Sequence, residues 1–439
     1  MRKNIVSALI ILIAGLSFSC KKTDPPYLIP IITSLSSTNL IAGSTLIING
    51  ENLGTDVSQV VATLFDVSGR NSEKLVITSV SNTSITVTIP NKPFTFGTRV
   101  YTLQIEIGNS IPQNGANRFQ LTIDYPEPAS KWFYVSNFFE GYGERSVFKS
   151  INFATDSIGY VVLGADLYST KDGGRTWEIW EGMGGNSSFP GYNPLYVFDK
   201  NNFWFHDGIY MLVSNDGKTL SMHKIIPPSG SLTFVGSFMS SSNKGQIAGY
   251  DGILYYINGS FLPDALIIEH KSKYYLPDTG DVPVYWQKMS NVDEFNLMLA
   301  GSAKIGGIEK PIISHKKAGV FTEYDISDIT NSTRIKALQL ANPNTAFLVD
   351  ANNDLFKLTG GTTWIKLSQK ATTIYFKDVN IGYASYDGKI LKTTDGGLSW
   401  KNEFNLEKGE TICTITEKNG KLWALGSNKG SGVILKYNP

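Results

Sequence analysis

The residue types that most often perform chemistry are few in this chain and form no familiar pattern. Its 439 residues include four histidines and two cysteines. None of them stands at the short intervals that bind zinc or that pair a nucleophile with its base. We therefore expect no catalytic residue, no metal site and no cofactor.

Aspartates in tight turns are the remaining polar candidates. Four of them fall between short apolar runs, and two lie in near copies of one Tyr-Asp-Gly turn: Asp166, Asp207, Asp251 (in Tyr250-Asp251-Gly252) and Asp387 (in Tyr386-Asp387-Gly388). If these turns share one face of the fold, their carboxylates could hydrogen-bond a sugar. The alternative is that Asp-Gly simply makes a tight hairpin turn. The pattern leaves both interpretations open.

A glycine-rich loop could add aromatic side chains to the same face. Residues 181–194 carry Phe189 and Tyr192, and Trp180 comes directly before them. Aromatic rings are suitable platforms for the apolar faces of sugars. We therefore include Trp180, Phe189, Tyr192, Tyr250 and Tyr386 with the turn aspartates as candidate ligand-binding residues.

The composition favours short strands and disfavours a nucleic-acid partner. Thirty-nine basic residues are balanced by 38 acidic ones, so the formal net charge is +1. Such a chain has no bulk field to attract nucleic acid. It is rich in glycine (42), phenylalanine (23) and tyrosine (21), while only 18% of its residues are charged. This composition predicts an all-β protein with many tight turns.

The N-terminus reads as a targeting signal. Arg2 and Lys3 precede an apolar stretch, Ile5 to Phe18, which is short for a membrane span. The following Ser19-Cys20 completes a segment that resembles the lipobox of bacterial lipoproteins, although Phe18 departs from the small residue usual there. The resemblance implies a signal peptide over residues 1–19, acylation of Cys20, and a tether over residues 20–27. It also implies anchoring in the cell envelope, at the outer membrane because Lys21 follows the cysteine. The alternative is an ordinary secreted protein.

Residues 28–124 alternate strands and turns at the spacing of a sandwich. Gly43 to Leu53 and Ser84 to Pro90 resemble the IPT/TIG family of immunoglobulin-like domains. That resemblance implies a spacer or a protein-contact module. A proline-rich linker is expected over residues 125–130.

Beyond the linker the sequence repeats itself. Phe153 and Phe376 are each followed by a glycine after 6 residues, an aspartate after 19 and a tryptophan after 24. The segments that end these repeats, 170–177 and 393–400, resemble Asp boxes, also called BNR repeats. In that family the boxed residues, here Asp172, Trp177, Asp395 and Trp400, are turn and packing residues. The family includes sialidases, sortilin-type receptors and photosystem II assembly factors, and it implies a β-propeller over residues 131–439.

We expect seven blades, with six or eight as alternatives, beginning near residues 147, 194, 232, 265, 335, 372 and 410. Residues 131–135 could pair with the last blade and close the ring. Strands alternate in direction within a blade. The turns between second and third strands should therefore lie opposite the Asp boxes.

An enzymatic function is disfavoured. Sialidases clamp the substrate carboxylate with three arginines. Residues 131–439 contain only Arg145, Arg175 and Arg334, and Arg175 lies inside a box. Cys413, in an alternating strand pattern, is expected to be a small buried side chain.

These observations predict a non-catalytic, lipid-anchored envelope protein that captures a glycan on the face opposite the boxes. A scaffold that binds a protein of the envelope is the alternative, and a glycoside hydrolase is less favoured.

Overall fold

The computed structural model describes residues 29–66, 72–91, 97–108, 117–127, 132–139, 148–163, 166–181, 195–207, 210–224, 234–241, 244–249, 252–258, 266–274, 284–428 and 431–438. Within these residues the fold is all-β, with one 3-10 turn (η1, Val57–Gln59). None of the helical structure described is long and apolar enough to cross a membrane. The chain divides into two compact units between Pro126 and Glu127.

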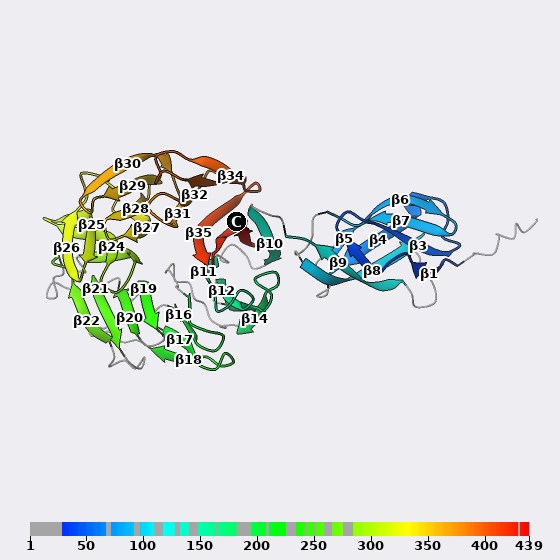
Figure 1. Cartoon of the computed structure of the whole chain (residues 1–439), viewed down its shortest axis with the longest axis horizontal. Coiled ribbons are helices and arrows are strands. Elements are labelled where there is room, and N and C mark those ends of the chain that lie inside the picture. The colour runs from blue at the N-terminus through cyan, green and yellow to red at the C-terminus, as the bar shows by residue number, and fades with distance from the viewer. Residues whose placement is uncertain are drawn as a thin grey trace, which may run out of the picture. The chain divides into compact units, whose positions relative to one another are not determined.

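The first unit contains two sheets (Figure 1). One has the order β1-β3-β7-β6, and the other β2-β9-β8-β4-β5. Alternate residues of the strands are buried, such as Leu46 and Ile48 of β3 and Leu103 and Ile105 of β8. This period of two is that of strands with one face on a core. The strands are β1 (Ile31–Leu35), β2 (Asn39–Ile41), β3 (Thr45–Glu51), β4 (Val60–Phe65), β5 (Ser72–Lys74), β6 (Val76–Ser81), β7 (Ser84–Thr88), β8 (Gly97–Ile107) and β9 (Arg118–Tyr125).

The described residues of the second unit form seven four-stranded antiparallel sheets, which lie around a common centre in Figure 1. We number them 1 to 7 along the chain. Sheets 1 to 3 are built from β11 (Phe148–Phe153), β12 (Gly159–Leu163), β13 (Asp166–Thr170) and β14 (Glu178–Glu181); β15 (Leu195–Val197), β16 (Phe203–Asp207), β17 (Tyr210–Ser214) and β18 (Ser221–Lys224); and β19 (Phe234–Ser241), β20 (Lys244–Gly249), β21 (Ile253–Asn258) and β22 (Leu266–Lys271).

Sheets 4 to 7 follow the same order of strands. They are built from β23 (Val284–Asn291), β24 (Leu297–Ile305), β25 (Ile308–Lys317) and β26 (Val320–Asp325); β27 (Ile335–Asn342), β28 (Thr345–Asp350), β29 (Asp354–Thr359) and β30 (Thr363–Lys370); β31 (Thr373–Phe376), β32 (Gly382–Tyr386), β33 (Lys389–Thr393) and β34 (Lys401–Asn405); and β35 (Glu410–Lys418), β36 (Lys421–Asn428), β37 (Ser431–Tyr437) and β10 (Trp132–Phe139).

Hydrophobic clusters join each sheet to the next. One cluster, for example, packs Val161 and Trp177 of sheet 1 against Phe133 and Trp423 of sheet 7. Similar clusters lie between sheets 1 and 2, 2 and 3, 3 and 4, 4 and 5, 5 and 6, and 6 and 7. The core of this unit is therefore divided into layers between sheets.

The starts of most sheets agree with the sequence analysis, and one does not. The segment expected to open a fourth blade near residue 265 is β22, the outer strand of sheet 3. The fourth sheet opens with β23 at Val284. The expected pairing of residues 131–135 with the end of the chain is confirmed, because β10 pairs with β37 from Trp132 opposite Tyr437.

Candidate functional site

Because neighbouring strands are antiparallel, the turns of every sheet in the second unit lie at the two opposite ends of its strands, and we call each of these ends an edge. Turns between first and second strands and between third and fourth strands lie at one edge, which we call the box edge. Turns between second and third strands, and the connections to the next sheet, lie at the other, which we call the connection edge. The segments 170–177 and 393–400 are at the box edge, and Asp387 is at the connection edge.

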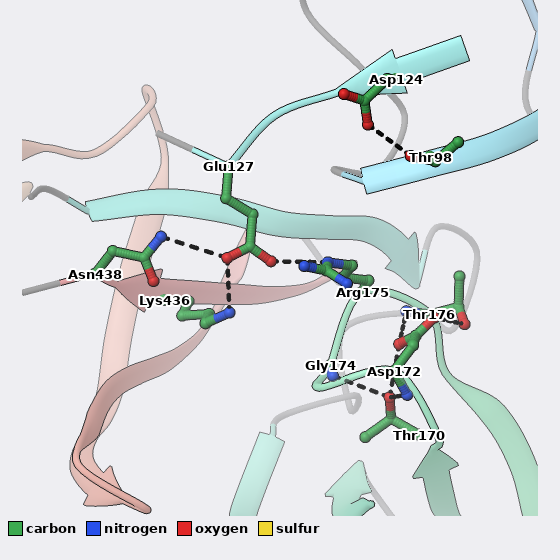
Figure 2. Close-up of polar contacts among 10 residues, drawn as sticks. All are labelled: Thr98, Asp124, Glu127, Thr170, Asp172, Gly174, Arg175, Thr176, Lys436 and Asn438. Atoms are coloured by element: carbon green, nitrogen blue, oxygen red, sulfur yellow. Dashed lines mark hydrogen bonds and ion pairs between the residues drawn. The ribbon is translucent and has the colours of Figure 1, made fainter. Parts of the chain in front are cut away.

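In the first box turn, the carboxylate of the aspartate accepts hydrogen bonds from other residues of the same turn (Figure 2). Asp172 Oδ1 accepts bonds from the Thr176 backbone N–H and the Thr170 hydroxyl, each at 2.9 Å. Its Oδ2 accepts the Thr176 hydroxyl at 2.6 Å. The Thr170 hydroxyl oxygen in turn accepts the Gly174 N–H at 2.9 Å. The carboxylate thus joins the two ends of a loop that is about as long as one turn of a helix, as short polar side chains commonly do.

The second box turn repeats this pattern. Asp395 accepts the Ser399 backbone N–H at 2.9 Å, the Ser399 hydroxyl at 2.5 Å and the Thr393 hydroxyl at 2.8 Å. The Ser399 hydroxyl and N–H hold the pKa of Asp395 down at about 2. A carboxyl so occupied and so acidic is poorly suited to donate or accept a proton near neutral pH.

One backbone hydrogen bond recurs at the box edge. It is present in the two box turns and also in turns that lack the box sequence. In five sheets a glycine N–H of the turn between third and fourth strands donates to a carbonyl of the turn between first and second strands. The pairs are Gly173 and Ser157, Gly217 and Asn201, Gly319 and Phe295, Gly361 and Asn344, and Gly396 and Asn380. The copy at Gly319 was not predicted from the sequence. Only the glycine is left there as a signal, and its φ of +86° explains why it persists.

The two box tryptophans pack between sheets. Trp177 is almost fully buried, with its ring edge toward Phe153 at a centroid distance of 6.1 Å. Trp400 is partly buried, packs in the same way on Phe376 at 6.0 Å, and donates its ring N–H to the Gly397 carbonyl. Edge-to-face contacts at this distance are favourable beyond the area they bury.

At the connection edge, Asp387 lies in a hairpin turn. The backbone conformation of this turn explains why an aspartate is present. Asp387 and Gly388 have φ angles of 50° and 67° and join β32 to β33 directly. Positive φ at both positions defines a type I′ hairpin turn, for which Asp-Gly is a favoured pair. Asp387 and Gly388 are exposed, and Tyr386 is half-buried. Asn353, with a φ of 65°, takes the corresponding place in sheet 5.

The other predicted ligand-binding residues are only partly described. Phe189, Tyr192, Tyr250 and Asp251 lie outside the described residues, as does Cys20. The backbone of Asp166 begins β13, opposite Leu163, and that of Asp207 ends β16, opposite Tyr210. Both positions are at the connection edge, as Asp387 is.

Trp180 is placed differently from its sequence neighbours. Its ring N–H donates to the carbonyl of Gly217 at 3.3 Å, in a box-edge turn of sheet 2. Its ring meets Phe203 edge-on at 5.2 Å. The side chain is therefore part of the packing between sheets 1 and 2 and points to the box edge, not to the opposite face expected from the sequence. The physical reason is the ring N–H, which finds a backbone acceptor there.

The expectation for Cys413 was wrong. The residue is exposed, not buried. The pairing of β35 with β36 skips one residue between Ile412 and Thr414, so a β-bulge interrupts the alternation on which the expectation rested. The thiol donates to the Leu425 carbonyl at 3.2 Å.

A charged cluster that the sequence did not reveal surrounds Glu127 (Figure 2). Its carboxylate accepts bonds from Arg175 Nε at 2.8 Å, Lys436 Nζ at 3.0 Å and Asn438 Nδ2 at 3.3 Å. Burial would raise the pKa of Glu127, but these donors together hold it below its usual value. Because the partners come from sheets 1 and 7, Glu127 connects the first and last sheets. The sequence carries no signal of this cluster, because Lys436 lies 309 residues from Glu127.

A second charged cluster lies between sheets 3 and 4. Glu269 pairs with the buried ammonium of Lys316 and accepts two bonds from Gln246 Nε2, at 2.9 and 2.8 Å. Burial of such an ion pair requires close partners for every charge. The cluster is a packing contact between sheets. No group of three or more His, Cys, Asp or Glu residues able to hold a metal occurs in the part of the chain that the structure describes.

Comparison with known proteins supports both halves of the fold. Residues 30–120 match the IPT/TIG domain, so the resemblance expected there is confirmed. No curated protein sequence matches the chain. Among solved structures, YCF48 from Cyanidioschyzon merolae has a TM-score of 0.55 at 16% identity, over 71% of this chain and 99% of that one.

Two further structures have the same architecture. YCF48 bound to D1 peptide gives a TM-score of 0.54 at 14% identity, covering 71% of this chain and 98% of that one. A catalytically inactive virginiamycin B lyase from Staphylococcus aureus with quinupristin gives 0.50 at 11%, covering 67% and 96%. These proteins are β-propellers, and at such identities the likeness shows the fold alone.

Proposed function

We propose that the chain is a lipid-anchored cell-envelope protein in which the IPT/TIG domain precedes a single seven-bladed propeller. Seven sheets and seven clusters between neighbouring sheets support the blade count. A crystal structure with another number of sheets around the axis would contradict it. The lipobox-like segment before Cys20 supports the anchor. Metabolic labelling with a fatty-acid analogue should mark the chain, and Cys20→Ser should abolish that label.

The propeller captures a glycan at its connection edge without cleaving it. The observation that carries this proposal is the difference between the two edges. At the box edge the carboxylates of Asp172, Asp216 and Asp395 are occupied within their own turns. At the connection edge Asp387 is exposed and directly follows the half-buried Tyr386 in the chain. An exposed carboxylate beside an aromatic ring is a suitable pair for a sugar.

A protein ligand is the second candidate. It is favoured by one comparison, because a structurally similar propeller, YCF48, has been solved with a bound D1 peptide. Fold-level likeness is an analogy, not a mechanism. A glycoside hydrolase is less favoured, since it needs two carboxylates at a defined separation. The connection edge carries Asp166, Asp207 and Asp387 on different sheets, and nothing selects a pair among them.

A glycan array tests the proposal. The chain from residue 21 onward is applied to the array, and every glycan that binds is then incubated with the protein and analysed for products. We expect binding without cleavage. Cleavage would contradict the non-catalytic assignment. No binding across a broad array would favour the protein ligand, which crosslinking in the envelope would then identify.

A further inference from the structure

The first described strand of the second unit, β10, lies at the outer end of its last sheet. It pairs with β37 and with no other described strand. The pairing is regular from Trp132 to Tyr134, and two register shifts follow, before Ser136 and before Phe139. We call residues 132–139 the strap. A strand that is paired on one side only, with interruptions, opens at a lower free energy than the strands beside it.

One carboxylate holds the chain just before the strap. Glu127 accepts Arg175 Nε at 2.8 Å and Lys436 Nζ at 3.0 Å (Figure 2). Asn438 Nδ2 donates to the same oxygen as Lys436, at 3.3 Å. Arg175 belongs to the box turn of sheet 1, whereas Lys436 belongs to β37. Side-chain bonds to two sheets therefore add to the strap's own pairing.

The position of Lys436 makes the charge of Glu127 important for the strap. The Lys436 side chain is only 5% exposed. Its ammonium lies 5.8 Å from the ring centre of Phe133, which belongs to the strap, and 5.7 Å from that of Trp423. A buried ammonium that loses its carboxylate is strongly unfavourable. Because Phe133 lies against this ammonium, movement of the strap would let water reach the charge.

The surrounding charges oppose a neutral Glu127. Burial would raise the pKa of Glu127, but its bonds from Lys436 and Arg175 hold it below the usual value of 4.5. Burial lowers the pKa of Lys436, Glu127 acts in the opposite direction, and the nearby cations Lys421 and Arg175 lower it further. The stabilisation by Glu127 is therefore complete above pH 4.5 and is lost as the pH falls through the lowered pKa.

We propose that the strap is a releasable strand, held in sheet 7 while Glu127 is charged and released when a proton neutralises that carboxylate. Release uncovers the backbone of β37 that the strap now pairs with, and an unpaired strand edge accepts another strand. This device goes beyond ligand capture at the connection edge and does not depend on it, since Arg175 lies in a box turn at the other edge.

Hydrogen exchange of the full chain, measured by mass spectrometry on peptides that cover the strap, reports its release. Glu127→Gln keeps the size of the side chain and removes its charge. At pH 7 we expect the strap of this variant to exchange about tenfold faster than that of the wild type, with sheets 2 to 5 unchanged. Glu178→Gln removes an exposed carboxylate of sheet 1 whose partner, Lys171, lies 3.9 Å away. This matched control should exchange as the wild type does.

The pH dependence gives a second readout. Below pH 4.5, after correction for the intrinsic rate of exchange, the strap of the wild type should lose its protection and match that of Glu127→Gln. Glu410 also contacts the strap, through the Tyr134 hydroxyl. The variant Tyr134→Phe lacks that bond, and its strap should show the same acceleration below pH 4.5. If Glu127→Gln does not fold, this measurement decides alone, and an absence of acceleration would overturn the proposal.

A double variant tests the role of charge. Glu127→Gln/Lys436→Met removes the buried ammonium together with its carboxylate, so most of the lost protection should return. Equal exchange of the strap in Glu127→Gln and the wild type at pH 7 would overturn the proposal. So would faster exchange that is equal in all sheets, or a double variant whose strap exchanges as fast as that of Glu127→Gln.

Discussion

Aspartate serves two purposes in this protein, and its surroundings decide which. Asp395 and Asp387 belong to the same sheet but lie at opposite edges. Asp395 accepts three hydrogen bonds within its turn. Asp387 is exposed, and the positive φ of its backbone is enough to explain why an aspartate is present there. A short carboxylate is a turn acceptor where backbone N–H groups converge on it, and it is available to a ligand where they do not.

The same substitution at the two sites should therefore give different results. Asp395→Asn should lower the Tm by roughly a few degrees, because it weakens charge-assisted bonds. Asp387→Asn should leave the Tm unchanged, since asparagine also adopts positive φ. The pKa of Asp395 is lowered from 3.8 to about 2 in the fold. Its stabilisation is therefore complete above pH 3.8 and is lost as the pH falls through about 2.

Thermal unfolding of the two variants and the wild type, measured at neutral pH and again near pH 2, checks this prediction. The difference between Asp395→Asn and the wild type should shrink at the lower pH. Equal loss of stability in both variants, or a difference that is independent of pH, would contradict the assignment of the two edges.

Single residues were the hardest part to predict from the sequence. Box aspartates could be identified because their partners are two to four residues away. Trp180 was placed on the wrong edge because its acceptor, Gly217, belongs to another sheet. Cys413 was expected to be buried because a bulge is invisible in a pattern of alternating residues. Contacts within a turn can be recognised in the sequence, because the residues stand at a fixed short spacing. Contacts between sheets have no such spacing.

At the scale of elements, the repeated spacing from phenylalanine to glycine has a simple cause. A Cβ atom on Gly159 would lie 2.3 Å from the Phe153 ring, and one on Gly382 would lie 2.4 Å from the Phe376 ring. The ring at the end of each first strand covers the glycine that opens the second strand. The six-residue offset seen in the sequence spans the turn between them, residues 154–158 in the first case.

Gly382→Ala should therefore destabilise the second unit by about 1–3 kcal/mol, the usual cost of overpacking a core. A smaller ring partner should relieve the clash, so the double variant Gly382→Ala/Phe376→Leu should lose less than the sum of the single changes. Chemical denaturation of the four proteins measures this coupling. Strictly additive losses would show that the contact does not set the spacing.

The starts of the sheets were also largely predictable. Six of the seven predicted starts lie within a few residues of a first strand, because turn residues separate the repeats. The fourth was misplaced at β22 because sheet 4 carries neither a box aspartate nor a box tryptophan. Only the turn glycine, Gly319, remains there. The starts of six sheets could be predicted, but not the boundaries of the most altered one.

At the scale of the whole molecule, contacts join the beginning and the end of the second unit. β10 adds to the last sheet beside β37, and the Tyr134 hydroxyl donates to Glu410 Oε2 at 2.5 Å. Glu127 binds Arg175 of sheet 1 and Lys436 of sheet 7. Without these contacts, the first and last sheets would each expose apolar side chains that now pack against one another.

Tyr134→Phe should cost about 1–2 kcal/mol, because the largely buried carboxylate of Glu410 loses a donor. Tyr386→Phe, which removes a hydroxyl from a half-buried residue at the connection edge, serves as the matched control. Urea unfolding monitored by tryptophan fluorescence reports on the second unit, since the chain's tryptophans all lie after residue 131. A control that loses as much stability as Tyr134→Phe would contradict a special role for the bond between Tyr134 and Glu410.

We propose that a ligand binds at the connection edge and not at the box edge. The most direct measurement is the affinity of a glycan identified on the array for the wild type and three variants. Tyr192→Ala and Asp251→Ala alter residues that the sequence predicts at the connection edge, and Leu398→Ala alters an exposed residue of the box edge. We predict that the first two weaken binding about tenfold or more, equivalent to about 1.4 kcal/mol, and that the third leaves it unchanged. Loss of binding in Leu398→Ala alone would contradict the account.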